Sequence, residues 1–282
     1  MRPIVITGAT GTLGRAFQRL CGERGLACHV TRRDELDIAD PDSVVAAIQR
    51  FEPWLVVNTA GYVRVDHAED DHERCHRENA LGPELLARAC ARDGVQLLAF
   101  SSDLVFDGEK GALYEEHDAA APLGVYGRTK LEAEQRILAA HPASLIIRTS
   151  AFFGPWDEHN FVTMALRELS AGRELRAAHD CHVSPTYVPD LVHTSLDLAI
   201  DGERGLWHLA NEGVTTWADF ARSAARVAGH AEDRVLSVPG SALAWRARRP
   251  RFSALGSSRG SLLPRLDDAL RRYHHARTQE TP

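Results

Sequence analysis

The sequence lacks the features that mark membrane proteins, disulfide-rich proteins and thiolate metal sites. No apolar run among its 282 residues approaches the roughly 20 that a membrane-spanning helix needs. The five cysteines are odd in number and show no C-x-x-C spacing, which argues against a disulfide framework or a thiolate zinc site. The opening MRPIVITGAT enters a strand-like segment at once and leaves no room for a signal peptide. We therefore expect a cytoplasmic protein with reduced thiols.

An excess of positive charge is also absent. The net charge of -6 disfavours a nucleic-acid partner, and no internal repeat or low-complexity tract interrupts the chain. With 44% hydrophobic and 26% charged residues, the chain can bury one large core or two modest ones. The composition predicts a globular protein with no nucleic-acid or membrane partner, and it leaves a homodimer open.

Short apolar runs alternate with helix-length stretches. The runs are PIVITG, ACHVTR, WLVVNTAG, QLLAFSS and SLIIRTS. Because they lack polar alternation, we expect strands covered on both faces, in an α/β fold with a Rossmann-type, doubly wound parallel sheet over residues 1–150. The βα rhythm stops there, so residues 151–282 predict a smaller C-terminal substrate-binding lobe. We expect the helix at about 187–200 to pack back on the first unit and the tail to fray from about residue 273.

A glycine-rich segment, ITGATGTLG, follows the first predicted strand and opens a helix. Gly8 and Gly11 permit the backbone to approach a pyrophosphate closely, and Gly14 lets the helix sit on the strand. The helix N-terminus offers unpaired N–H groups to the anion. The segment predicts a dinucleotide site made of Gly8, Thr10, Gly11, Thr12, Leu13 and Gly14.

The end of the second predicted strand, HVTRRDELD, indicates which dinucleotide binds. A site that prefers NAD usually offers a carboxylate to the ribose hydroxyls, whereas here Arg32 and Arg33 come first and can grip a 2′-phosphate. Two solvated arginines remain the alternative. We predict NADPH rather than NADH, with Asp37 at the adenine edge and Ile38 in the same site.

The stretch VYGRTKLEAEQRIL places Tyr126 and Lys130 four residues apart, on one face of a predicted helix. Taken alone, this pair is also typical of a core-edge tyrosine beside a solvated lysine. Ser102 ends the QLLAFSS strand, at the edge of an open α/β sheet where ligands bind. The residues alone leave open whether the Tyr126 and Lys130 pair serves a reaction or only covers the edge of the core.

The ordered motifs ITGATGTLG, NTAG, SSDLVFDG and YGRTK make the chain similar to the extended short-chain dehydrogenase/reductases. It resembles the dTDP-4-dehydrorhamnose reductase family in particular, through LDIADPDSV, NTAGYVRVDHAE, ENALGP, SSDLVFDG, VYGRTKLEAE, IIRTSAFFG, SPTYVPDL and RRPRFSAL. The resemblance extends to about residue 272.

This resemblance implies NADPH-dependent reduction of the 4-keto group of a nucleotide-activated 6-deoxy sugar. In the implied catalytic set, Ser102 orients the carbonyl, Tyr126 donates the proton and Lys130 lowers the phenol pKa. The further cofactor contacts that it implies are Asn58, Ala60, Gly61, Asn79 and Lys130. The implied substrate contacts are Val65, Asp103, Leu104, Ala151 and Arg249.

Departures from the family pattern leave the substrate open. Leu104 stands where that reductase has tyrosine, and Ala151 stands where it has tryptophan. Leu104 also argues against a dehydratase, which carries a glutamate there, and Arg32 and Arg33 argue against an epimerase with bound NAD. A reductase or epimerase of a different nucleotide sugar and a non-catalytic NADP-binding regulatory subunit remain alternatives.

Two polar segments are candidates for further sites. HERCH at 72–76 fits the H-E-x-x-H zinc signature, but no third ligand is evident, so a solvated helix face is the favoured interpretation and no metal is predicted. The arginine-rich WRARRPR can meet a diphosphate, and Arg249 is the preferred contact because its Arg-Pro pair matches the family motif.

Overall fold

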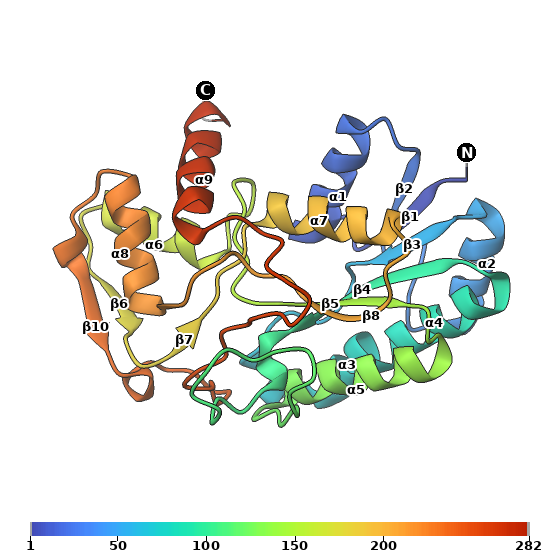
Figure 1. The fold of residues 1–282 in the computed structure, drawn as a ribbon, viewed down its shortest axis with the longest axis horizontal. Helices are drawn as coiled ribbons and strands as arrows, with labels where there is room; N and C mark the ends of the chain where they lie inside the picture. The colour runs from blue at the N-terminus through green and yellow to red at the C-terminus, as the bar shows by residue number, and fades with distance from the viewer. Residues whose placement is uncertain (1, 281–282) are drawn as a thin grey trace.

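A parallel sheet of six strands forms the centre of the computed structural model, which describes residues 2–280 (Figure 1). The strands are β1 (Ile4–Thr7), β2 (Cys28–Thr31), β3 (Leu55–Asn58), β4 (Gln96–Ser102), β5 (Leu145–Thr149) and β8 (Gly205–His208). They lie in the order β2-β1-β3-β4-β5-β8, so the direction of winding reverses between β1 and β3. Ligands of open α/β sheets bind at such a switch point, beyond the carboxyl ends of the strands.

The predicted α/β, doubly wound fold is confirmed, and the five apolar runs form its first five strands. Strands β1, β3 and β5 are buried along their whole length, which is why their sequences show no polar alternation. The sequence did not predict β8, which pairs with β5 from beyond residue 150. Its four residues, GLWH, are too short a pattern to reveal a strand.

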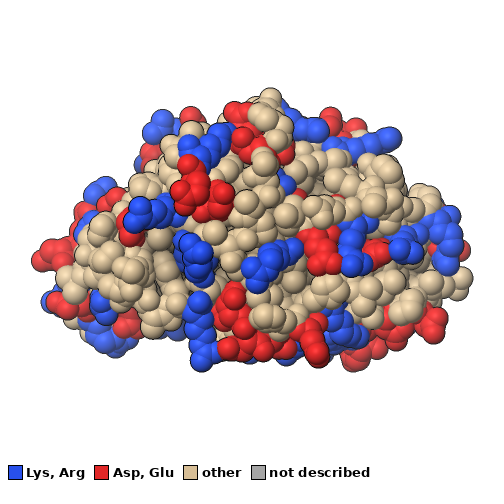
Figure 2. Space-filling view, turned by 90° about the horizontal axis from the view of Figure 1, so that it is seen from below, with Lys and Arg blue, Asp and Glu red and all other residues tan. Residues whose placement is uncertain are grey.

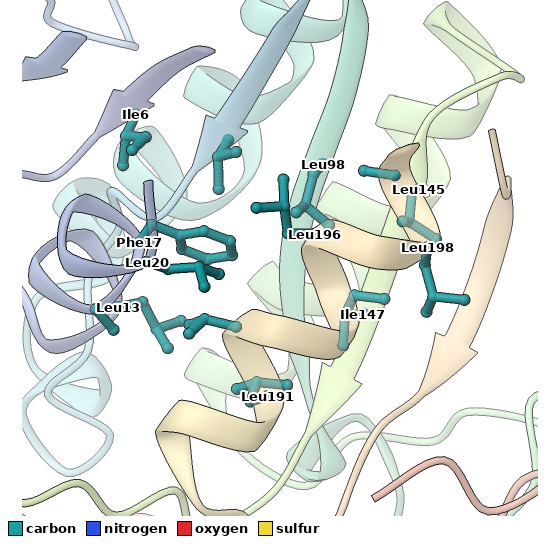
Figure 3. Close-up of a cluster of buried hydrophobic side chains, with 14 of the residues drawn as sticks. Ile6, Leu13, Phe17, Leu20, Leu98, Leu145, Ile147, Leu191, Leu196 and Leu198 are labelled. Atoms are coloured by element: carbon teal, nitrogen blue, oxygen red, sulfur yellow. The ribbon is translucent and has the colours of Figure 1, made fainter. Parts of the chain in front are cut away.

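One face of the sheet is covered by α1 (Thr12–Glu23) and α7 (Val188–Ile200), drawn above the sheet in Figure 1. Phe17 and Leu20 of α1 and Leu191 and Leu196 of α7 join strand residues such as Ile147 in one buried cluster (Figure 3). Helix α7 comes from beyond residue 150, yet it packs against α1 and β4. The chain therefore returns to the sheet after leaving it.

The other face is covered by α2 (Pro41–Phe51), α4 (Gly82–Asp93) and α5 (Val125–Ala140). Asp40 caps α2, its side chain accepting from two backbone N–H groups of the first turn. Between β3 and α4 the chain forms η1 (His67–Glu69), α3 (His72–His76) and the π-helical turn η2 (Arg77–Leu81), and β4 is followed by η3 (Asp103–Val105).

A smaller cluster of elements lies to the left of the sheet in Figure 1. It contains α6 (Phe161–Ser170), β6 (Leu175–Ala178), β7 (His182–Val183), β9 (Thr215–Thr216), α8 (Trp217–Val227), η4 (Glu232–Arg234), β10 (Val235–Val238), η5 (Gly240–Ala242) and α9 (Leu266–Glu280). Strand β10 pairs in parallel with β6, and β7 pairs antiparallel with β9. The division of the chain at residue 150 stays a prediction.

The expected fraying from about residue 273 is wrong, because α9 continues to Glu280. Tyr273 is only 1% exposed, and its ring lies 5.5 Å from that of Phe153 between centroids. Its phenol oxygen is 2.7 Å from Thr163 Oγ1. The polar sequence RRYHHAR concealed this anchor, since a single buried tyrosine leaves little periodicity to read.

All five cysteines carry free thiols. Within residues 2–280, the longest apolar helical stretch falls short of what is needed to cross a bilayer.

Replacing Tyr273 by alanine should lower the free energy of unfolding by about 3 kcal/mol or more, since it empties a fully buried ring site. Tyr273→Phe should cost about 1 kcal/mol, the usual worth of one hydrogen bond. Urea denaturation curves of the two variants and the wild type measure both losses. Equal midpoints for all three would mean that α9 contributes little to the fold.

Candidate active site

The glycine-rich loop between β1 and α1 allows only glycine at two places. Gly8 has φ +77°, in the left-handed region, and a Cβ at Gly14 would lie 2.2 Å from Gly8 O. Gly11 N donates to Gly8 O at 3.0 Å, which closes the turn. The loop residues Gly8 to Gly11 therefore line an open groove just ahead of the N-terminus of α1, where a pyrophosphate can be held.

This groove has a volume of about 790 Å³ and crosses the switch point between β1 and β3. It is lined by Gly8, Ala9, Thr10, Gly11, Arg32, Arg33, Asp34, Leu36, Asp37, Ile38, Thr59, Ala60, Gly61, Val63 and Glu78. Its size, its glycine floor and its two arginines fit a phosphorylated dinucleotide. Thr59 and Glu78 are wall residues that the sequence did not predict.

The two arginines of the groove differ in their freedom. Arg33 is held by Glu78, with Nη2 2.9 Å from Oε1, and lies 3.6 Å from an Asp37 oxygen. Within the described chain, the Arg32 guanidinium makes no ion pair, and Arg32 lines the groove, so its charge is available to a ligand there. Burial would raise the pKa of Asp37, but hydrogen bonds from Arg77 and from Ala39 N hold it below its usual value.

The remaining predicted cofactor residues support the groove from behind. Asn58 accepts from Thr7 Oγ1 at 2.7 Å, and Asn79 accepts from Tyr62 N at 2.7 Å, so both are engaged within the protein. Thr12 donates to Asp157 at 2.9 Å, and Leu13 is buried in the core. The residues predicted for the cofactor that do not line the groove are Thr12, Leu13, Gly14, Asn58, Asn79 and Lys130.

A second cavity, of about 300 Å³, lies at the carboxyl ends of β4 and β5 and adjoins the groove at Val63. It is lined by Val63, Val65, Ser101, Ser102, Asp103, Leu104, Tyr126, Thr149, Ala151, Phe152, Cys181, Val183, Trp217, Arg249, Pro250 and Ser253. All five predicted substrate residues are in this wall, together with Ser102 and Tyr126. Their roles stay predictions, but the fold brings them to one place.

The electrostatics of the Tyr126 and Lys130 pair correct one expectation. Burial, together with the nearby Asp103 and Cys75, raises the pKa of the Tyr126 phenol instead of lowering it. Lys130 Nζ lies 5.9 Å from the centroid of the Tyr126 ring and donates to Phe100 O at 2.8 Å, and among the described residues no hydrogen bond joins it to the Tyr126 hydroxyl. Burial also lowers the pKa of Lys130 to about 8. Tyr126 therefore holds its proton at neutral pH.

Asp103 lines the cavity and accepts hydrogen bonds from three serine hydroxyl groups. Its carboxylate accepts from Ser253 at 2.6 Å, from Ser150 at 2.9 Å and from Ser102 at 3.1 Å. Burial raises the pKa of Asp103, and the three hydroxyl donors oppose that rise. The side chain thus orients the Ser102 hydroxyl and joins β4 to two later segments, which the sequence alone did not indicate.

The wall that would face a sugar contains a fully buried hydroxyl with no partner among the described residues. Thr149 Oγ1 is buried and, within residues 2–280, has no hydrogen-bond partner. Ala151 adopts φ +40°, a conformation that costs a non-glycine residue about 1 kcal/mol or more and is found mainly at functional sites. Sequence reasoning missed Thr149, although it precedes Ser150 at the end of a predicted strand, where such side chains are expected.

The arginine-rich segment borders another cavity of about 300 Å³, which shares Cys181 and Arg249 with the first. Arg249 is already engaged, donating to Asp66 at 3.1 Å and lying 5.3 Å from the Trp245 ring centroid. Among the described residues, Arg248 and Arg251 have no ion-pair partner and line this cavity. Figure 2 views the molecule from below, where basic side chains stand near the middle of the face.

The two histidines of HERCH have separate partners. His72 Nε2 contacts Glu69 O at 2.9 Å, and His76 Nε2 contacts Glu132 at 3.1 Å. In the part of the chain that the structure describes, no three His, Cys, Asp or Glu side chains are grouped to hold a metal ion.

We predict that Gly14→Ala weakens NADPH binding at least tenfold, because its methyl group would strike the Gly8 carbonyl and displace the loop. Gly22→Ala is the matched control: it lies in the same helix with open space around it and should leave affinity unchanged. Quenching of tryptophan fluorescence by NADPH measures both affinities. Wild-type affinity in Gly14→Ala would contradict the loop's role.

Comparison with known proteins places this architecture in a family. Residues 1–273 match the family model described as RmlD substrate binding domain. The dTDP-4-dehydrorhamnose reductase of Mycobacterium tuberculosis strain H37Rv is 38% identical over 265 residues, which cover 92% of this chain and 86% of the relative. A probable dTDP-4,6-dihydroxy-2-methyloxan-3-one 4-ketoreductase of Streptomyces antibioticus is 35% identical, covering 90% of this chain and 87% of the relative.

Among solved structures, the dTDP-4-dehydrorhamnose reductase of Bacillus anthracis in complex with NADP is 29% identical, with a TM-score of 0.92. The match covers 96% of this chain and 98% of that one. The Clostridium acetobutylicum dTDP-4-dehydrorhamnose reductase gives 30% identity and a TM-score of 0.91 over 96% and 98% of the two chains. The chain described here therefore belongs to the RmlD substrate-binding-domain family.

Proposed function

We propose that the protein catalyses NADPH-dependent reduction of the 4-keto group of a dTDP-activated 6-deoxy sugar. One observation carries the proposal: the hydroxyl groups of Ser102 and Tyr126 line a single cavity that meets the dinucleotide groove at Val63. A keto sugar in that cavity would have its carbonyl beside two hydroxyl donors and next to the cofactor. The names of the relatives, dTDP-4-dehydrorhamnose reductase among them, support the substrate class.

The cofactor would be held by the glycine loop, with Arg32 toward the 2′-phosphate. When bound, NADPH supplies the hydride that reduces the carbonyl carbon. Ser102 Oγ, which accepts from Leu104 N and donates to Asp103, would turn its one proton from Asp103 to the carbonyl oxygen. Tyr126, protonated at neutral pH because its pKa is raised, would give its proton to the alkoxide as it forms.

Lys130 has a different part in this scheme from the one that the family resemblance implies. Burial, Asp103 and Cys75 raise the pKa of the phenol, and the ammonium of Lys130 does not bring it below its ordinary value. It lies close enough to stabilise the phenolate that remains after Tyr126 has given up its proton, which is an interaction that grows during the reaction. The charge on Lys130 is therefore required at the moment of proton transfer.

The sugar cavity would recognise its substrate with few polar groups. Leu104 and Ala151 remove two aromatic side chains that the family pattern has, and Thr149 Oγ1 is the buried hydroxyl without a partner in the described wall. A sugar hydroxyl that satisfies Thr149 would recover the cost of burying it, about 1–3 kcal/mol. The diphosphate would extend into the adjoining cavity, toward Arg248 and Arg251.

Tyr126→Phe should lower kcat by about 10²–10⁴-fold, because it removes only the proton donor. NADPH affinity should stay within about twofold, since Tyr126 does not line the dinucleotide groove. NADPH oxidation is followed at the nicotinamide absorbance, with a dTDP-4-keto-6-deoxy sugar made by a coupled dehydratase. Undiminished turnover would refute the assignment, and tight NADPH binding by the wild type without turnover on any keto sugar would favour a non-catalytic regulatory subunit.

Arg248→Ala and Arg251→Ala should each raise KM by about tenfold and leave kcat nearly unchanged, since a diphosphate contact is remote from the reacting carbon. Arg246→Ala is the matched control, because Arg246 pairs with Asp70 and does not line the cavity. Steady-state kinetics at saturating NADPH separate the two constants. An effect of equal size in all three variants would indicate a general loss of positive charge and no diphosphate site.

A further inference from the structure

A buried ion pair lies beneath the reaction site and takes no part in the chemistry proposed above. Glu134 on α5 and Arg148 on β5 are 5% and 4% exposed. Arg148 donates to both carboxylate oxygens of Glu134, from Nε at 2.8 Å and from Nη2 at 2.6 Å. Ser101 Oγ donates to the same carboxylate at 2.5 Å. The Glu134 carboxylate is thus held in one position by two elements of the sheet.

This carboxylate lies one helical turn beyond Lys130, on the same face of α5. Lys130 Nζ donates to Phe100 O, and Glu134 accepts from the next residue of β4, Ser101. The ammonium and the carboxylate therefore contact consecutive residues of one strand.

The surroundings of Lys130 contain few other charges. From the elements packed around it, the titratable groups are Tyr126 and Glu134 of α5, Asp103 of η3 and Cys75 of α3. Burial raises the pKa of Cys75, so that thiol is neutral at pH 7. Burial of Lys130 disfavours its charge, and Glu134 is the group that opposes this most.

Arg148 is bounded on its far side by groups that add no negative charge in contact with it. His208 Nε2 lies 3.3 Å from Arg148 Nη1, and burial lowers the pKa of His208, which keeps it neutral at pH 7. The Phe106 ring centroid lies 5.0 Å from Arg148 Cζ. Glu116 accepts a hydrogen bond from the backbone N–H of His208, so it is one residue removed from Arg148 in this series of contacts. The charge of Arg148 therefore offsets part of the field of Glu134 at Lys130.

We propose that Glu134 is a positioning residue of this site, whose buried carboxylate keeps the Lys130 ammonium charged, while Arg148 sets how strongly it does so. The link to catalysis rests on the proposed function, in which a charged Lys130 stabilises the phenolate of Tyr126. The two partners of the ion pair then act in opposite directions. Removing the carboxylate lets Lys130 lose its proton at lower pH, and removing the guanidinium lets Lys130 retain it to higher pH.

The composition of the chain makes this directly measurable. Lys110 and Lys130 are its only lysines, so protein labelled with [¹³Cε]lysine gives two NMR titration curves. Lys110 is partly exposed and contacts Asp118 and the Leu113 carbonyl, away from the site, and serves as the internal reference. The wild-type midpoint of Lys130 is expected near pH 8. This readout needs no substrate, so it stands even if the proposed function fails.

Glu134→Gln, which keeps the shape of the side chain, should lower the Lys130 midpoint by about one pH unit or more. Arg148→Met should raise it. Glu132→Gln is the matched control, since Glu132 lies on the same helix and contacts His76 and Arg136 away from the site. It should leave the midpoint unchanged. Shifts of the same sign in Glu134→Gln and Arg148→Met, or a shift in Glu132→Gln, would overturn the proposal as a general effect of loosened packing.

Kinetics test the catalytic half. Because the charged form of Lys130 is the active one, kcat should be present below pH 8 and should fall as the pH rises through that value. In Glu134→Gln this fall should move to lower pH by the same amount as the NMR midpoint. In Lys130→Arg the fall should vanish, and adding Glu134→Gln should not restore it, since arginine stays charged. Comparing Lys130→Arg with the double variant Lys130→Arg and Glu134→Gln also tests the proposal if Arg148→Met does not fold. A midpoint that shifts while the kcat profile does not would overturn the catalytic role alone.

Discussion

The parallel direction of β1, β3, β4 and β5 is the constraint on which the site depends. Since parallel strands end at one edge of the sheet, the residues that follow each of them meet there. The glycine loop after β1, Ala60 and Gly61 after β3, Ser102 at the end of β4 and Ala151 after β5 all lie at that edge. Helix α5 then adds Tyr126 from outside the sheet. The groove and the cavity adjoin because neighbouring strands build them.

Burial sets the protonation states at this edge. The same packing that holds Tyr126 and Lys130 in place raises the pKa of the phenol and lowers that of the ammonium. Each shift favours the neutral form. This suits Tyr126 as the proposed proton donor, but it opposes the positive charge of Lys130. The pair formed by Glu134 and Arg148 answers this by placing a fixed carboxylate one turn from the lysine. Under the proposal made above, this carboxylate keeps Lys130 charged in a site where charge is costly.

Much of this arrangement was predictable because it depends on local pattern. Apolar runs of strand length predicted five of the six strands, and the spacing of Gly8, Gly11 and Gly14 predicted the loop. The features that the sequence did not predict depend on contacts between residues that are distant along the chain. Strand β8 is recognisable only beside β5, and the order in α9 only once Tyr273 meets Phe153 and Thr163. The three serine donors of Asp103 were not predictable either, because nothing local shows that they surround it, and its contact with a sugar stays a prediction.

The sequence by itself determined the α/β class and the glycine-rich loop, since both follow from residue type and spacing along the chain, and its resemblance to a known family pointed to the serine, tyrosine and lysine. Only the tertiary structure decided which arginines are free, with Arg33 and Arg249 engaged and Arg32, Arg248 and Arg251 facing open cavities. It also decided the sign of the Tyr126 pKa shift. Both depend on which groups lie within a few ångströms in space and on how much water is excluded, and neither is encoded in spacing along the chain.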